Sequence, residues 1–271
     1  MHRFFVTSFL TSLITLLSYG VVAAQASSRA AVTTSCEEEL RTAQDRLTRL
    51  NSYLQDWPNL AYFRDANAQL AQPKNNERRV VFMGDSNTDY WDNPGYGGFF
   101  PGRPYVNRGI AGQITPQMLI RFRQDVIALR PKVVVILAGT NDIAGNIGPT
   151  TFTAIENNLT TMSELAKAHG IRVVLASLLP VSDYNRTRDG KPLIRTIERP
   201  LIRLQTLNSW MKQYAAEVGF VYLDYFSRLA DEKGLLKKEF SDDGVHPNSK
   251  GYEVMTPLAE VAISKALRSK K

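Results

Sequence analysis

We expect a three-layer α/β fold, in which helices cover both faces of a parallel sheet, over most of this 271-residue chain. Two observations predict it. From Arg79 onward, short apolar runs alternate with segments of helical periodicity, as in chains that build a parallel sheet from strand–helix units. The runs are almost wholly apolar, as in strands that are buried on both faces. The predicted strands are 80–83, 105–107, 133–138, 173–179 and 220–223.

The segments between and after these runs predict helices over 115–130, 152–169, 201–218 and 249–267. Thr115 followed by Pro116 fits a helix start, with the hydroxyl as the cap and proline at the first helical position. Gly170 and Gly219 fit helix ends, because glycine readily adopts the left-handed backbone that closes a helix.

The first 26 residues are predicted to be a signal peptide and not part of the fold. Arg3 supplies a positive start, residues 4–17 are largely apolar, and Ala24-Gln25-Ala26 resembles a cleavage site, so we expect cleavage after Ala26. A membrane anchor is the alternative, but the apolar part is interrupted by Ser and Thr and is short for a span. A lipid anchor at Cys36 fits less well, since Thr-Thr-Ser precedes it and it lies far beyond the apolar run. We therefore expect a secreted or periplasmic protein without a stable membrane span.

Residues 27–78 are predicted to form a helical extension and a connector. Ser35 and Glu38 fit a capping box, and apolar residues then recur at steps of three and four. They are Leu40, Ala43, Leu47, Leu50, Leu54 and Trp57. This pattern indicates an amphipathic helix that ends near Pro58 and packs on its own domain, or alternatively an extended helix that pairs with another. The remaining domain is predicted to cover 79–271.

Removal of residues 1–26 leaves 245 residues, enough for one large domain, with 32 basic and 26 acidic side chains. The excess of +6 favours anionic surfaces, glycans or phospholipid headgroups, or simply gives a soluble basic surface. Cys36 is the only cysteine, so no internal disulfide forms. After cleavage, His169 and His246 are the only histidines that remain, so the chain has too few of the usual ligands and we expect no zinc site. We also expect no organic cofactor and no nucleic-acid partner, and the oligomeric state stays open.

Ser86 is the candidate nucleophile. It follows the first apolar run through Gly84-Asp85, a turn signal, and would open a helix at the end of a strand. In an open parallel sheet, ligands bind at the carboxyl ends of the strands, because the loops there leave a crevice and helix N-termini point into it. The alternative is structural, since Asp85 and Ser86 are both favoured helix caps.

A serine attacks an ester only if a base accepts its proton. Asp243 stands three residues before His246 in a turn-rich stretch, so its carboxylate is in a position to hold the imidazole while the other ring nitrogen faces Ser86. In the alternative, Asp242 or Asp243 caps a turn and His246 is an exposed loop residue.

Hydrogen-bond donors for the developing oxyanion are expected at neighbouring strand ends. Gly112 follows the second run, and its backbone N–H can approach a substrate closely because glycine has no side chain. Asn141 follows the third run and offers an amide, and the N–H of Ser86 supplies a third donor. Each residue type is also an ordinary choice at a turn or cap.

These blocks, in this order, resemble the SGNH hydrolases, also called GDSL-type esterases and lipases. The resemblance covers Gly84-Asp85-Ser86, Gly109 to Gly112, Gly139 to Asp142 and Asp243 to His246, and runs over most of 79–265. It implies a flavodoxin-like five-stranded parallel sheet. It also implies Ser86 as nucleophile, His246 as base and Asp243 as its orienting acid, with Ser86, Gly112 and Asn141 as oxyanion donors. Asn87 departs from the Leu or Ile that often follows the serine, which indicates altered local packing or polarity and not a loss of activity, since this position is not a catalytic one.

Two loops are candidates for substrate recognition. Residues 91–104 are rich in glycine and aromatic side chains, which either bind a sugar ring or acyl chain or complete a core. Residues 181–199 are rich in charge, which indicates a solvated loop or an anion site. The expected substrate contacts near these loops are Asp85, Tyr90, Trp91 and Tyr184.

The resemblance implies a serine esterase that forms an acyl-serine intermediate on small O-acyl esters, with O-acetylated carbohydrate ahead of lipid, and the predicted signal peptide indicates that it is exported. A lysophospholipase, thioesterase or broad arylesterase is the alternative within the family. A non-catalytic glycan-binding relative is the alternative from another class.

Overall fold

The computed structural model describes residues 36–51, 54–96 and 98–268, so the predicted signal peptide lies outside the described residues. Residues 36–51 are helical, within the range predicted for the amphipathic helix. The chain divides into two units, and the second, Pro58–Lys271, holds the sheet and its helices. None of the helices in the described part of the chain is long and apolar enough to cross a bilayer.

The sheet has five parallel strands in the order β2-β1-β3-β4-β5, which confirms the predicted fold class. The strands are β1 (Val80–Gly84), β2 (Tyr105–Gly109), β3 (Val133–Leu137), β4 (Arg172–Ala176) and β5 (Val221–Leu223). The predicted run 173–179 extends beyond β4, because the chain leaves the sheet at Ser177. There the Ser177 hydroxyl accepts the N–H groups of Tyr225 and Phe226, at 2.9 Å each.

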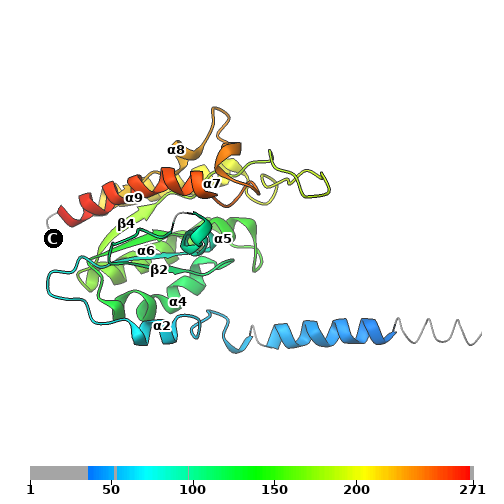
Figure 1. Cartoon of the computed structure of the whole chain (residues 1–271), viewed down its shortest axis with the longest axis horizontal. Helices are drawn as coiled ribbons and strands as arrows, with labels where there is room; N and C mark the ends of the chain where they lie inside the picture. Colours follow the sequence, from blue (N-terminus) through cyan, green and yellow to red (C-terminus); the bar gives the residue numbers. More distant parts are fainter. Residues whose placement is uncertain (1–35, 52–53, 97, 269–271) are drawn as a thin grey trace, which may run out of the picture. The chain divides into compact units, whose positions relative to one another are not determined.

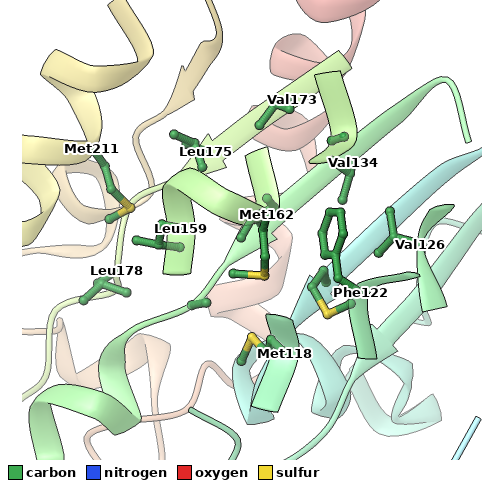
Figure 2. Packing of buried hydrophobic residues seen from close by; sticks show 14 of the residues in the cluster. Met118, Phe122, Val126, Val134, Leu159, Met162, Val173, Leu175, Leu178 and Met211 are labelled. Atoms are coloured by element: carbon green, nitrogen blue, oxygen red, sulfur yellow. The ribbon is translucent and has the colours of Figure 1, made fainter. Parts of the chain in front are cut away.

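Helices cover both faces of the sheet (Figure 1). One face carries α4 (Thr115–Asp125), α6 (Phe152–Ala168) and α7 (Leu201–Val218), and the other carries α8 (Phe226–Leu229) and α9 (Ser249–Arg268). Alternate residues of each strand point to opposite cores: Val81 and Met83 face the first, and Val80 and Phe82 the second. Figure 2 shows the first core, where Met118 and Phe122 of α4 lie near Met162 of α6.

Helix α4 begins and ends differently from the prediction. Ile114 is its N-cap, and its N–H donates to Gln117 Oε1 at 3.1 Å, so the prediction that Thr115 caps the helix is wrong. Regular helix stops at Asp125, since Val126 turns away (φ −127°, ψ −65°), and η3 (Ile127–Leu129) follows. The predicted ends of α6 and α7 are confirmed, with left-handed φ values of 69° at Gly170 and 78° at Gly219.

Residues 58–78 belong to the same compact unit as the sheet. They contain α2 (Arg64–Gln69), which packs against α4. Asn67 Nδ2 donates to Asp125 Oδ1 at 2.6 Å, and the Arg108 guanidinium lies 4.5 Å from the centre of the Phe63 ring. The connector is therefore anchored on α4 and β2.

The carboxyl ends of β2, β1 and β3 lie next to one another in the sheet. Short helices begin at this edge: α3 (Ser86–Asp89) and η1 (Tyr90–Asp92) after β1, and α5 (Thr140–Ala144) after β3. Two further single turns are η2 (Pro94–Tyr96) and η4 (Lys238–Phe240). Glycine is required at the end of β2, since a Cβ on Gly109 would lie 2.2 Å from the backbone N of Asp89. Its absence lets α3 pack directly on the strand.

Candidate active site

Ser86 is the first residue of α3, at the carboxyl end of β1. Asp85 is the N-cap of this helix, and its Oδ1 accepts the N–H of Asn87 at 2.9 Å. From α9, the Tyr252 hydroxyl donates to the Asn87 carbonyl at 3.1 Å. These contacts hold the start of α3 in place, and the serine is nearly buried, at 5% exposure.

The structure brings His246, 160 residues away along the chain, next to Ser86, and Asp243 lies beside His246. His246 Nε2 lies 2.9 Å from Ser86 Oγ, and His246 Nδ1 lies 2.6 Å from Asp243 Oδ2. A carboxylate only accepts hydrogen bonds, so Nδ1 carries the proton and the neutral ring presents Nε2 as the acceptor for the serine hydroxyl. This is the geometry of a serine–histidine–aspartate triad.

Asp243 is held in its ionised form. Partial burial alone would raise its pKa, but hydrogen bonds from the His246 ring and from the backbone N–H groups of His246 and Val245 lower the pKa well below its usual range. Both N–H groups donate to Oδ1 at 2.8 Å, which leaves Oδ2 for the imidazole. The carboxylate is therefore charged at neutral pH and fixed in orientation.

The loop that carries Asp243 is fastened to the charged loop 181–199. Arg195 Nε donates to the Asp243 carbonyl at 3.0 Å, and Ser182 N–H donates to the Gly244 carbonyl at 2.9 Å. Gly244 has a φ of 81°, and a Cβ there would lie 2.3 Å from the Ser182 carbonyl oxygen. The prediction of a mainly solvated loop is thus incomplete, because part of the loop supports the acid.

The three predicted oxyanion donors lie on adjacent strand ends. Gly112 has a left-handed φ of 77° and open space where a side chain would point. Asn141 Nδ2 donates to the carbonyl of Gln113, the neighbour of Gly112, at 3.0 Å. In the part of the chain that the structure describes, the N–H groups of Ser86 and Gly112 have no protein acceptor. Both are thus available to an oxygen of the substrate.

The predicted substrate contacts are placed unequally. Tyr90 is 39% exposed, and its ring centre lies 4.9 Å from that of His246. Trp91 is 1% exposed and stacks on Tyr252 within the second core, so its ring is out of reach of a substrate. Asp85 is equally buried. Tyr184 donates its hydroxyl to Asp231 at 2.6 Å. Only Tyr90 therefore adjoins the triad with an exposed side chain.

Asp85 combines burial with an unusual protonation equilibrium. Burial raises its pKa to about 6, and the N–H of Asn87 and the charge of His246 offset only part of this shift. Its Oδ2 is buried without a hydrogen-bond partner among the described residues. The folded state thus binds a proton at Asp85 more tightly than the unfolded chain does.

This carboxyl predicts a pH dependence of stability. The raised pKa of Asp85 adds about 3 kcal/mol to the free energy of unfolding at low pH. This stabilisation is fully present below the pKa of the unfolded chain, near 4, and is lost as the pH rises through about 6. Asp85→Asn should remove this dependence. In urea titrations from pH 4 to pH 7, the unfolding free energy of Asp85→Asn minus that of the parent should rise with pH. A constant difference would contradict the raised pKa of Asp85.

Sequence reasoning missed several residues that support the site. Asp142 accepts the Thr115 hydroxyl at 2.6 Å and so ties α5 to the start of α4. Gln113 and Arg121 are buried beside the loop of Gly112. The available signal was Arg121 on the apolar face of the predicted helix, three residues after Met118 and four before Asp125.

A serine–histidine–aspartate arrangement at the carboxyl edge of a five-stranded parallel sheet, beside free N–H donors, defines a serine hydrolase of the α/β class. The sequence profile of the GDSL-like lipase/acylhydrolase family matches residues 82–254. The chain belongs to this family, which places it among the carboxylic ester hydrolases of the SGNH superfamily.

Two solved relatives agree with this assignment. A candidate acylhydrolase of Bacteroides fragilis is 41% identical, with 79% of this chain and 99% of that chain covered and a TM-score of 0.71. A GDSL-like lipase of Bacteroides thetaiotaomicron is 38% identical, with coverages of 78% and 100% and a TM-score of 0.69. The lipoprotein YqeF of Bacillus subtilis is 31% identical in an alignment 128 residues long, and the alignment covers 39% of this chain. The chain spans about half the length of this curated relative, at 50% coverage.

Proposed function

We propose that this protein is an exported serine esterase that hydrolyses short O-acyl esters of polar alcohols, with O-acetylated carbohydrate as the substrate class. The observation that carries the proposal is the continuous hydrogen-bonded path from Asp243 Oδ2 through His246 to Ser86 Oγ, at 2.6 and 2.9 Å. Export rests on the predicted signal peptide over residues 1–26.

In the proposed reaction, Ser86 Oγ attacks the ester carbonyl carbon while its proton passes to His246 Nε2. The carbonyl oxygen becomes an oxyanion, which accepts hydrogen bonds from the N–H groups of Ser86 and Gly112 and from Asn141 Nδ2. His246 then protonates the departing alcohol, and an acyl-serine remains. A water molecule, deprotonated by His246, attacks the acyl carbon and releases the carboxylic acid with Ser86 restored.

The surroundings of the triad favour a short acyl group. Arg199 is buried, its Nη1 lies 2.9 Å from Glu198 Oε2, and its Nη2 lies 3.5 Å from Asn141 Oδ1. Tyr90 is partly exposed, and its ring lies beside that of His246. A charged pair and one ring suit a polar alcohol such as a sugar, since a ring face packs on the apolar side of a pyranose. They give little apolar surface to a long chain.

A series of p-nitrophenyl esters tests this preference. An apolar acyl groove would add about 0.8 kcal/mol, or about fourfold, for each methylene that it buries. We expect no such rise: kcat/KM should be highest for the acetate or propionate and at least about tenfold lower for the octanoate.

Acetate release from acetylated xylan fragments, followed beside this series, tests the carbohydrate assignment. Release at a rate comparable with that from p-nitrophenyl acetate would support it. An optimum at eight carbons or more would contradict it and favour the lysophospholipase alternative.

A further inference from the structure

A fully buried cation, Arg121, joins the strand ends that lead to the proposed oxyanion donors. Its side chain is 0% exposed. Its guanidinium donates to Gln113 Oε1 at 2.6 Å, Asp125 Oδ2 at 3.1 Å, and the carbonyls of Gly84 at 3.1 Å and Arg108 at 2.9 Å. Gly84 precedes the Asp85-Ser86 turn, and Arg108 precedes the loop of Gly112. One side chain therefore sets the spacing between both turns.

Arg121 keeps its charge in this position. Burial lowers its pKa to about 10, and the charge and hydrogen bond of Asp125 offset part of the shift. A buried guanidinium with four acceptors is stable only while the acceptors stay in place, since each lost partner leaves an uncompensated polar group. The cation thus resists displacement of the two strand ends.

Gln113 connects this cation to two of the donors. Its Oε1 accepts from Arg121, its Nε2 donates to the Pro58 carbonyl at 2.9 Å, and its own carbonyl accepts from Asn141 Nδ2 at 3.0 Å. It also follows Gly112 directly in the chain. A shift of Gln113 would therefore move the Gly112 N–H and the Asn141 amide together.

The connector before the sheet completes the arrangement. Asn67 of α2 donates to Asp125 and accepts from Arg108 Nε at 2.9 Å, so it binds both residues that flank the cation. Pro58 holds the amide of Gln113 from the same segment. Residues 58–70 thus reach the loop of Gly112 through two independent hydrogen-bonded routes.

We propose that Arg121 and Gln113 are positioning residues for the oxyanion hole, and that Pro58 and Asn67, from the segment before the sheet, are the support on which Gln113 is held. The inference rests on the proposed acyl transfer at Ser86. It assigns a catalytic consequence to a segment that precedes the sheet and contributes no atom to the triad.

Gln113→Leu in the full chain tests the proposal, because it removes both side-chain hydrogen bonds and keeps similar volume and the main-chain carbonyl. Displacement of donors by about 1 Å costs on the order of 10²-fold in rate. We expect kcat on p-nitrophenyl acetate to fall about 10- to 100-fold, with KM changed less than about threefold. Each rate is divided by the concentration of reactive Ser86, which is measured by labelling with a fluorophosphonate to completion. Unfolded protein is then not counted.

The affinity for phenylboronic acid is a second measurement, and a general loss of stability would not change it in the folded protein. It forms a tetrahedral, oxyanion-bearing adduct on the serine, so its affinity should fall in proportion to kcat/KM. Gln124→Leu is the matched control, since Gln124 Nε2 donates to the Leu60 carbonyl of the same segment at 2.8 Å without touching Gln113. This control should keep kcat and boronate affinity within about twofold of the parent.

A second variant keeps the test decisive if Gln113→Leu does not fold. Gln113→Glu retains the acceptor for Arg121 and loses the donor to Pro58, and we expect at least a fivefold fall in kcat at unchanged KM. If the folded Gln113 variants match Gln124→Leu in kcat and boronate affinity, the positioning role is wrong while the proposed function stands. If the parent shows no esterase activity, or Ser86→Ala retains it, the proposed function itself fails.

Discussion

Replacing Ser86 with alanine is expected to lower turnover of p-nitrophenyl acetate by about 10⁴- to 10⁶-fold, the cost of removing a triad nucleophile. The hydroxyl is 2.9 Å from His246 Nε2, and in the described part of the chain no other serine or threonine hydroxyl is recorded in contact with that nitrogen. Among the described residues, no other hydroxyl is therefore in place beside His246 to form the acyl-enzyme. KM is uninformative at such rates, so initial rates at saturating ester should be compared.

Covalent labelling separates loss of the nucleophile from loss of the fold. A fluorophosphonate should add one equivalent to the parent and none to Ser86→Ala, while the circular dichroism and melting temperature of the two proteins agree. Unchanged ester hydrolysis by Ser86→Ala would eliminate the proposed mechanism. Labelling that persisted in the variant would show that a different residue is acylated.

Asp243→Asn is expected to lower turnover by about 10³- to 10⁴-fold. An asparagine can present its amide N–H to His246 Nδ1, which moves the ring proton to Nε2. The ring then loses the acceptor that takes the proton of Ser86. The backbone hydrogen bonds from Val245 and His246 to Oδ1 can remain, so the variant should fold and accept the fluorophosphonate slowly.

The neighbouring aspartate is the control for this change. Asp242 Oδ1 accepts from Asn248 Nδ2 at 3.2 Å in an exposed position, and no contact with the His246 ring is recorded among the described residues. Asp242→Asn should keep kcat within about threefold of the parent. If Asp242→Asn were the more damaging of the two, the orienting acid would have been assigned to the wrong residue.

The strands and most helices were predictable because their residues satisfy a local rule. A strand buried on both faces must be apolar throughout, so Val80–Gly84 and Val133–Leu137 stand out in the sequence. The triad residues were predictable for another reason. Serine, aspartate and histidine stood at strand ends or turns, and the carboxyl edge of a parallel sheet brings such positions together.

What could not be predicted depends on contacts between segments far apart in sequence. From the sequence, Trp91 in a glycine-rich loop could bind substrate or belong to the core. Its stacking on Tyr252, which is far away in the sequence, shows that it belongs to the core. The role of Arg121 requires the ends of β1 and β2 and the loop of Gly112 to meet. Thr115 matched the pattern of a cap, but its hydroxyl binds the buried carboxylate of Asp142 instead.

The long separation between Ser86 and His246 has a consequence for biosynthesis. His246, the proposed base, lies 160 residues after Ser86, the proposed nucleophile, and just before α9, whose Tyr252 donates a hydrogen bond to α3. A chain emerging from the ribosome thus displays Ser86 long before His246 is synthesised. Contacts of such high sequence separation form late, because closing a long loop has a large entropic cost. Under the proposed mechanism, a nascent chain that lacks the His246 segment cannot hydrolyse an ester, because the proposed base is missing.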